Sequence, residues 1–305
     1  MESPPSFIFL PILFHILVTF RCTSAVEPAC HTKCGPLEVK YPLGTGYGCG
    51  SPRFHPYVTC PPAGDQLLLT THTGSYPITS ISYATSTLTI TPPSMSTCTS
   101  MQPSPTKLGL DWASPFQLGP STFILLSCPP PTSSLTIKGT PICDPSSSYL
   151  CASIYTCPAV VTLGLPLFPP TNTCCVYSPA NLDNKNEELD LNKLKCAGYA
   201  SVVSLGDAPT DPSQWQYGVA LKYSLGGLEN YNTATSCHGC ELSDGVCGYS
   251  PPGNSFVCVC KSGFNTSTDC YYYNHDQDFF MSSTSQLTWK VCLGLLAGLL
   301  SCMAA

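Results

Sequence analysis

Short segments in which apolar and polar residues alternate recur along the chain, and they predict β-strands separated by loops. The clearest such segments are residues 37–41, 66–73, 79–91 and 217–223. Residues 217–223 alternate most regularly, which indicates a strand with one buried face. Residues 122–126, TFILL, predict a mainly apolar strand, and we expect residues 135–137 to be its partner.

Prolines and glycines interrupt these segments and predict irregular connections. Pro42 follows the first segment, and three consecutive prolines at 129–131 cannot lie inside a sheet because proline lacks the backbone N–H. In residues 44–50, GTGYGCG, glycines alternate with other residues, and glycine permits a positive φ. We therefore expect a tight, exposed loop at residues 44–50.

One polar stretch, residues 181–195, has leucines at a partly helical spacing and predicts a short helix or a surface turn. A calcium loop formed by its acidic residues is the alternative interpretation. An EF-hand needs acidic ligands at alternating positions and a central glycine, which this stretch does not supply. The acidic residues concerned are Asp183, Glu187, Glu188 and Asp190.

The composition points to a secreted, disulfide-stabilised protein. Charged residues make up 10% of the 305 residues and hydrophobic residues 43%, and there are 31 prolines and 21 cysteines. A cysteine-dense chain with little charge is typical of an oxidising compartment. We predict a mainly β fold with irregular loops, built from disulfide-rich small β modules.

The N-terminal 25 residues have the pattern of a signal peptide. An apolar run from Phe7 to Phe20 precedes the small residues Thr23-Ser24-Ala25, and we expect cleavage after Ala25. A membrane-spanning helix is the alternative. The run is shorter than the ~20 residues that a bilayer requires, and it contains Pro11.

Residues 282–305 have the pattern of a GPI-attachment signal. Small residues at Ser282 and Ser283 precede a polar spacer and the apolar tail Val291–Ala305. We expect the anchor on Ser282 or Ser283, which would place the protein on the outer face of the plasma membrane. A short tail anchor and free secretion are the alternatives.

Removal of both end segments leaves an even number of cysteines, eighteen, in three runs of six. We expect nine disulfides, whose pairing the cysteine spacing does not determine. The neighbours Cys174 and Cys175 should each bind a different segment. The eighteen are Cys30, Cys34, Cys49, Cys60, Cys98 and Cys128; Cys143, Cys151, Cys157, Cys174, Cys175 and Cys196; and Cys237, Cys240, Cys247, Cys258, Cys260 and Cys270.

The most distinctive segment runs from Cys30 to Cys60, CHTKCGPLEVKYPLGTGYGCGSPRFHPYVTC. In the order of its residues it strongly resembles the galacturonan-binding domain at the extracellular N-terminus of plant wall-associated receptor kinases. The resemblance resumes at Trp215-Gln216-Tyr217-Gly218 and closes with the Cys-rich C-terminal module of those ectodomains, Cys237 to Cys270. The family's kinase half is absent from this sequence.

The resemblance implies a division of the chain into parts. Between the signal peptide (1–25) and the apolar tail (282–305), we expect a galacturonan-binding-like domain at 26–110, a Cys/Pro-rich middle region at 111–196 and a C-terminal Cys-rich wall-associated-kinase module at 197–281.

The last module ends in C-x-C-x-x-G-F, which resembles the tail of an EGF-like domain. That analogy implies the pairs Cys237–Cys247, Cys240–Cys258 and Cys260–Cys270. The alternative is half a zinc site at Cys237-His238-Gly239-Cys240. An oxidising compartment and the even number of cysteines argue against thiolate ligands, and we expect no metal there.

The resemblance also implies a ligand, demethylated pectin, which carries one carboxylate per galacturonate. Binding it requires cations for the carboxylates and aromatic faces for the sugar rings. Residues 26–110 have four basic and three acidic side chains, against six and fourteen in residues 111–282, so a polyanion meets least repulsion at the N-terminal domain. The residues that we expect to bind pectin are Lys33, Lys40, Arg53, His31, His55, Tyr41 and Tyr47.

The alternative is that these are ordinary solvated residues. Three cations form a thin basic patch, so we expect weak, salt-sensitive binding in which Ca²⁺ bridges the protein to pectin. Motifs such as G-x-S-x-G and H-E-x-x-H do not occur, and we predict no catalytic residues and no enzyme activity. Asn265-Thr266-Ser267 is a glycosylation sequon.

The first functional hypothesis is therefore a non-catalytic, GPI-anchored ectodomain that binds pectic polysaccharide. Two other hypotheses remain: a protein-binding co-receptor or decoy that partners a receptor kinase through the acidic C-terminal part, and a structural wall protein. No feature suggests binding to nucleic acid.

Overall fold

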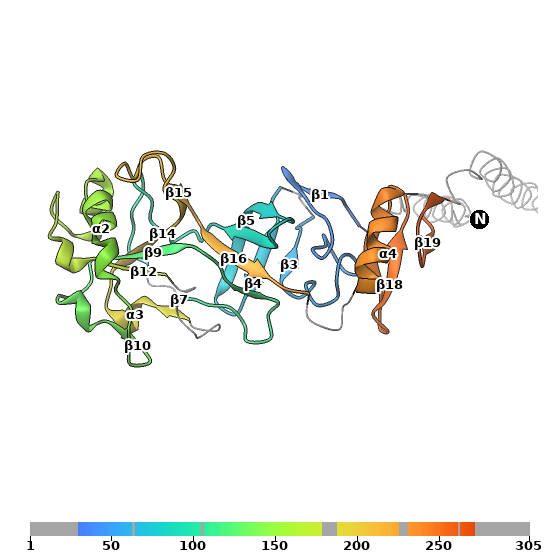
Figure 1. The fold of residues 1–305 in the computed structure, drawn as a ribbon, viewed down its shortest axis with the longest axis horizontal. Coiled ribbons are helices and arrows are strands. Elements are labelled where there is room, and N and C mark those ends of the chain that lie inside the picture. The colour runs from blue at the N-terminus through green and yellow to red at the C-terminus, as the bar shows by residue number, and fades with distance from the viewer. Residues whose placement is uncertain are drawn as a thin grey trace, which may run out of the picture.

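The structure is a computed structural model that describes residues 30–62, 65–104, 107–178, 188–225, 231–261 and 263–271. The predicted signal peptide, the anchor residues Ser282 and Ser283, and residues 181–187 of the polar stretch lie outside the described residues. The molecule is elongated, and its three larger sheets follow one another along the long axis (Figure 1). This arrangement confirms the mainly β, disulfide-rich fold class.

The central sheet has six antiparallel strands in the order β3-β4-β5-β6-β16-β8. This sheet contains strands from all three expected parts of the chain, 26–110, 111–196 and 197–281. Its hydrogen bonds therefore cross both expected domain limits, and the division at residues 110 and 196 stays a prediction. The strands are β3 (Val58–Thr59), β4 (Leu68–Thr71), β5 (Gly74–Ser82), β6 (Thr87–Ile90), β8 (Phe116–Leu118) and β16 (Val219–Tyr223).

A four-stranded sheet lies at one end, in the order β12-β9-β14-β15. Its central strand β9 is apolar because both of its faces are buried. Phe123 and Leu125 join the core of the central sheet, whereas Ile124 and Leu126 pack against α2 and the adjacent turns. The strands are β9 (Thr122–Leu126), β12 (Cys175–Tyr177), β14 (Gly198–Ser204) and β15 (Gln216–Tyr217).

Gly218 connects these two sheets. The expected strand at 217–223 is divided there, because β15 ends at Tyr217 in one sheet and β16 begins at Val219 in the other. A Cβ at this position would overlap the Cγ2 of Thr89. The close approach of two strands explains why a glycine occupies this position.

The remaining elements are short. The expected pairing of residues 135–137 with 122–126 is wrong, because β10 pairs with β11 in its own hairpin while β9 pairs with β12 and β14. These elements are β1 (Lys33–Cys34), β2 (Leu37–Glu38), β7 (Lys107–Leu108), β10 (Thr136–Ile137), β11 (Thr140–Pro141), β13 (Leu189–Asp190), α2 (Ser148–Ile154), α3 (Leu191–Leu194) and the 3₁₀ turns η1 (Thr132–Ser134), η2 (Pro145–Ser147), η3 (Pro158–Leu163) and η4 (Thr171–Thr173).

The C-terminal module has a core made of cystines. Helix α4 (Tyr231–Leu242) packs on a sheet of β17 (Val246–Ser250), β18 (Ser255–Val259) and β19 (Asn265–Thr266). The three disulfides implied by the EGF analogy are confirmed. Asn265, the predicted glycosylation residue, is exposed on β19.

The other six disulfides do not follow the runs of six cysteines. Cys98 and Cys128 pair with residues of the second run, so the chain forms two, four and three bridges in succession. The expectation for the neighbours Cys174 and Cys175 is confirmed, because they bind different segments. The pairs are Cys30–Cys49, Cys34–Cys60, Cys98–Cys157, Cys128–Cys196, Cys143–Cys175 and Cys151–Cys174.

We predict that Gly245→Ala disrupts the C-terminal module. A Cβ there would lie 2.5 Å from the Sγ of Cys258 and 2.7 Å from that of Cys240. The overpacked cystine core should cost roughly 1–3 kcal/mol and lower the yield of correctly paired protein. Peptide mapping under non-reducing conditions and thermal unfolding would measure both. Gly253→Ala is the control, because a Cβ at Gly253 meets nothing within 4 Å. Equal yields and stabilities of the two variants would contradict the prediction.

Candidate functional site

The glycine loop, residues 44–50, is docked against the C-terminal module. The expectation of an exposed loop is wrong, because backbone hydrogen bonds from β17 cover it. The Gly50 N–H donates to the Cys247 carbonyl at 2.8 Å, and the Tyr249 N–H donates to the Gly48 carbonyl at 2.9 Å. Within the loop, Thr45, Cys49 and Gly50 are buried.

A glycine on β17 permits this docking, and a glycine of the loop permits the loop to close. A Cβ at Gly248 on β17 would overlap the Gly48 carbonyl oxygen. Gly50 has a φ of +67°, and a Cβ there would lie 2.6 Å from the Leu43 carbonyl carbon. Gly248 thus serves the contact between the two modules, whereas Gly50 serves the tight closure of the loop.

An exposed tyrosine ring projects from this junction. The Tyr47 side chain is 69% exposed, and its ring centroid lies 5.3 Å from that of His55 and 6.2 Å from that of Tyr249, both in edge-on geometry. Arg53 is exposed in the same turn as His55, residues 52–57. We call Tyr47, His55, Tyr249 and Arg53 the Tyr47 surface.

Two of the three predicted cations lie beside an acidic residue. Glu38 lies opposite Lys33 in the β1–β2 pair, and its carboxylate is 3.3 Å from the Lys40 Nζ. Glu38 therefore offsets part of the charge of both lysines, and Arg53 is the predicted cation that shares a turn with His55.

The other predicted residues lie around these groups. His31 is exposed, and its backbone N–H donates to the Thr45 hydroxyl at 2.9 Å. Tyr41 lies on a different part of the junction, where its backbone N–H donates to the Glu241 carboxylate at 3.3 Å. The structure thus brings together Tyr47, His55 and the segment of Arg53, and separates Tyr41 from them.

Tyr83 is held beside Tyr41 by its hydroxyl. The Lys40 N–H donates to the Tyr83 Oη at 2.7 Å, and the Tyr83 hydroxyl donates to the Glu38 carbonyl at 3.0 Å. Burial raises the pKa of Tyr83 to about 12, although the hydrogen bond from Lys40 opposes this effect. The ring is therefore fixed and uncharged over the physiological pH range.

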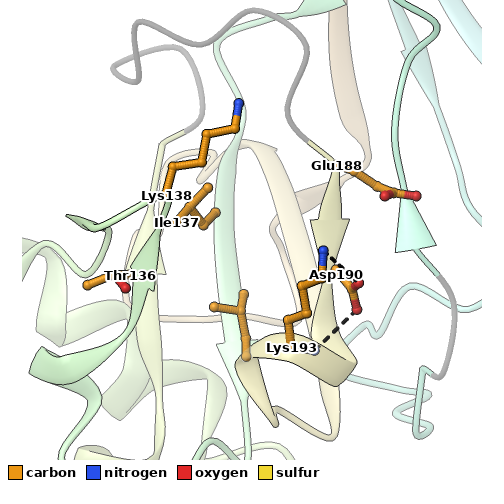
Figure 2. A pocket seen from close by; sticks show the side chains of 7 residues that line it. Thr136, Ile137, Lys138, Glu188, Asp190 and Lys193 are labelled. Atoms are coloured by element: carbon orange, nitrogen blue, oxygen red, sulfur yellow. Dashed lines mark hydrogen bonds and ion pairs between the residues drawn. The ribbon is translucent and has the colours of Figure 1, made fainter.

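A cavity of about 330 Å³ opens elsewhere, where β10, β13 and α3 meet (Figure 2). Its two carboxylates are paired with lysines. Asp190 lies 3.5 Å from Lys107 and 3.7 Å from Lys193, and Glu188 lies 3.5 Å from Lys107. Burial raises the pKa of Asp190, but the Lys193 N–H and the charges of Lys107 and Lys193 outweigh it and hold the pKa below its ordinary value.

These pairs argue against the calcium loop considered above. Glu188 and Asp190 neutralise lysines, and Asp190 also caps α3 by accepting the Asn192 and Lys193 N–H groups. The prediction of a short helix is confirmed at residues 191–194. Asp183 and Glu187 lie outside the described residues.

The zinc alternative fails because its cysteines are oxidised. Cys237 and Cys240 are disulfide-bonded, so neither offers a thiolate. The sulfurs of Cys258, Cys260 and Cys270 also lie within 4.8 Å of one another, and all three are in disulfides too.

Sequence patterns missed Tyr249, Tyr83 and Glu241. Each lies far along the chain from its partner, and Glu241 is 200 residues from Tyr41. The sequence offers one indication of such a contact, the alternation of glycines in residues 44–50. Glycines indicate that two backbone segments approach closely, but they do not identify the second segment.

We predict that Gly248→Ala releases the glycine loop from β17, because its Cβ would displace the Gly48 carbonyl. Chymotrypsin should then cleave the chain after the exposed Tyr47 several-fold faster. Because the Cys30–Cys49 disulfide holds the two fragments together, they are separated by reduction before they are measured. Gly253→Ala is the control. Equal cleavage of both variants and the original protein would exclude a docked loop.

We also predict an alkaline loss of stability that depends on Tyr83. The pKa of Tyr83 is raised in the folded state from 10.0 to about 12. The neutral hydroxyl therefore contributes its full share to the free energy of unfolding below pH 10, and this contribution is lost as the pH rises through 12. The difference in unfolding free energy between the original protein and Tyr83→Phe should therefore shrink above pH 10. Denaturant unfolding at pH 8 to 12 measures it, and a constant difference would contradict this assignment.

Two family models match the chain. The model described as "Wall-associated receptor kinase galacturonan-binding" matches residues 30–92, and the one described as "Wall-associated receptor kinase C-terminal" matches residues 171–263. The first includes the glycine loop and the second includes β17, so the junction joins the two matched regions.

A curated relative covers the same span. Wall-associated receptor kinase-like 20 of Arabidopsis thaliana is 30% identical over 247 residues. The alignment includes 77% of this chain and only 35% of the relative, so the chain spans about a third of the relative's length. No solved structure matches the chain. Among the described residues, no helix combines the length and the apolar character needed to cross a bilayer. The resemblance is thereby confirmed: the chain is a wall-associated-receptor-kinase-like ectodomain, with a galacturonan-binding domain and a wall-associated-kinase C-terminal module.

Proposed function

We propose that the protein is a non-catalytic polysaccharide-binding protein of the cell surface that recognises pectin, the galacturonan of the plant cell wall. The match of residues 30–92 to the galacturonan-binding family supports the ligand class. The same family match supports an extracellular location in contact with the wall. The GPI anchor on Ser282 or Ser283 and the glycan on Asn265 stay predictions.

The observation that carries the proposal is the Tyr47 surface. A tyrosine ring that is 69% exposed, and supported edge-on by His55 and Tyr249, offers a flat apolar face to a sugar ring. Arg53 in the adjoining turn supplies a guanidinium that can bind a carboxylate through two hydrogen bonds. An acidic polysaccharide presents both partners in every residue.

The rest of the predicted set has a smaller role in this proposal. Lys33 is exposed on β1 and adds charge, whereas the Lys40 ammonium is paired with Glu38. With so few free cations we expect modest, salt-dependent affinity, and Ca²⁺ would bridge galacturonate carboxylates to acidic groups of the protein.

A receptor kinase is the second partner that we propose. The relative is, by its name, a receptor kinase-like protein, and this chain aligns with about a third of it. The protein would then act as a co-receptor or decoy. A purely structural role in the wall is a further alternative, but no contact or charge described above favours it.

We predict that charge reversal at Arg53 of the Tyr47 surface, combined with charge reversal at Lys33 of β1, weakens pectin binding. Lys33→Glu with Arg53→Glu should lower the affinity of the full chain for immobilised polygalacturonate roughly tenfold or more, because charge-assisted hydrogen bonds are lost. Tyr47→Ala should also weaken binding. A salt series with and without Ca²⁺ would show an affinity that falls as salt rises.

The matched control is Lys138→Glu with Lys261→Glu, which changes the net charge equally on other parts of the protein. Binding that both double variants weaken equally would mean that only the net charge matters. Absence of polygalacturonate binding under every condition would refute the proposal.

A further inference from the structure

A second hollow lies at the junction, between β16 of the central sheet and helix α4. It is a groove of about 290 Å³, comparable with the smallest pockets that hold a ligand. Three tyrosines, Tyr41, Tyr83 and Tyr223, contribute to its wall. Ser86 and the α4 residues Ala234, His238 and Glu241 also line it.

The walls of this groove are preorganised. Two backbone hydrogen bonds hold the Tyr83 hydroxyl, and the Tyr41 N–H binds the Glu241 carboxylate, which ties helix α4 to the N-terminal module. Ser86 has a φ of +51°, and its carbonyl accepts the Tyr223 N–H at 2.9 Å.

The charge of the groove differs from that of the Tyr47 surface. Its lining has no lysine and no arginine, and Glu241 is its carboxylate. A galacturonate carboxylate would be repelled there, whereas a sugar hydroxyl could donate to the Glu241 oxygen. Tyrosine rings beside a hydrogen-bond acceptor suit an uncharged pyranose ring.

We propose that this groove binds one uncharged sugar unit, a methyl-esterified galacturonate or a neutral hexose, of the polysaccharide. The proposal rests on the proposed function and deepens it. The Tyr47 surface binds carboxylates and the groove rejects them, so the protein recognises partly esterified chains through two sites of opposite charge preference.

The test blocks the groove without removing any of its contacts. Ala234 is exposed on α4 and lines the groove, so Ala234→Trp fills it, whereas Leu242→Trp adds the same ring to an exposed position of α4 outside the lining. Titrations of the full chain would use a fully methyl-esterified oligogalacturonide, a neutral galacto-oligosaccharide of equal length and de-esterified polygalacturonate.

Ala234→Trp should weaken binding of at least one uncharged oligomer tenfold or more and leave polygalacturonate binding within about twofold. Leu242→Trp should change neither. The oligomer that loses affinity identifies the unit as the ester or the neutral hexose. Equal effects of the two tryptophans, or no binding of either uncharged oligomer to the original protein, would overturn the proposal.

Glu241→Gln provides a second test, because the amide oxygen can still accept the Tyr41 N–H. Without the negative charge, the groove should admit a galacturonate, so the preference for esterified over de-esterified oligomers of equal length should fall several-fold. An unchanged preference would overturn the role of Glu241. If the original protein binds polygalacturonate and Ala234→Trp leaves the affinity for both uncharged oligomers unchanged, the groove alone is refuted. If Ala234→Trp weakens binding of an uncharged oligomer but the original protein does not bind polygalacturonate, the Tyr47 surface alone is refuted.

Discussion

A backbone contact between two distant segments organises the functional end of this protein. The glycine loop lies edge to edge with β17, so Gly48 and Gly50 meet Cys247 and Tyr249 without intervening side chains. Because backbone hydrogen bonds fix the register of the contact, they also fix which rings meet. Both candidate sugar sites lie along this junction, and neither belongs to one module alone.

Two kinds of core support that contact. Strand β9 of the end sheet sends alternate side chains into two apolar clusters, one of which also contains the core of the central sheet, and the chain crosses between these sheets at Gly218. The C-terminal module has little apolar surface, and three disulfides replace a conventional core there. Small secreted modules depend on such bridges because they cannot bury enough apolar area.

Local patterns predicted the strands near 68–71 and 219–223 and the oxidised state of the cysteines, and the resemblance to an EGF-like domain implied the pairing of the last six cysteines. They could not predict that Cys98 and Cys128 pair beyond their own run, or that β9 pairs with β12 and β14, since long-range partners leave no trace in local spacing. The same limit applies to the site. Tyr41, Tyr47 and His55 were found as residue types, but Tyr249 approaches Tyr47 and His55, and Glu241 approaches Tyr41, only through the fold.

Hydrogen exchange of the Gly50 and Tyr249 amides, followed by NMR in the full chain, tests the docked junction most directly. Both N–H groups donate to backbone carbonyls across the junction. The account predicts that they exchange as slowly as the amides paired between β17 and β18. Exchange at the rate of a freely exposed loop would mean that the glycine loop and β17 are apart, which contradicts a binding surface shared by the two modules.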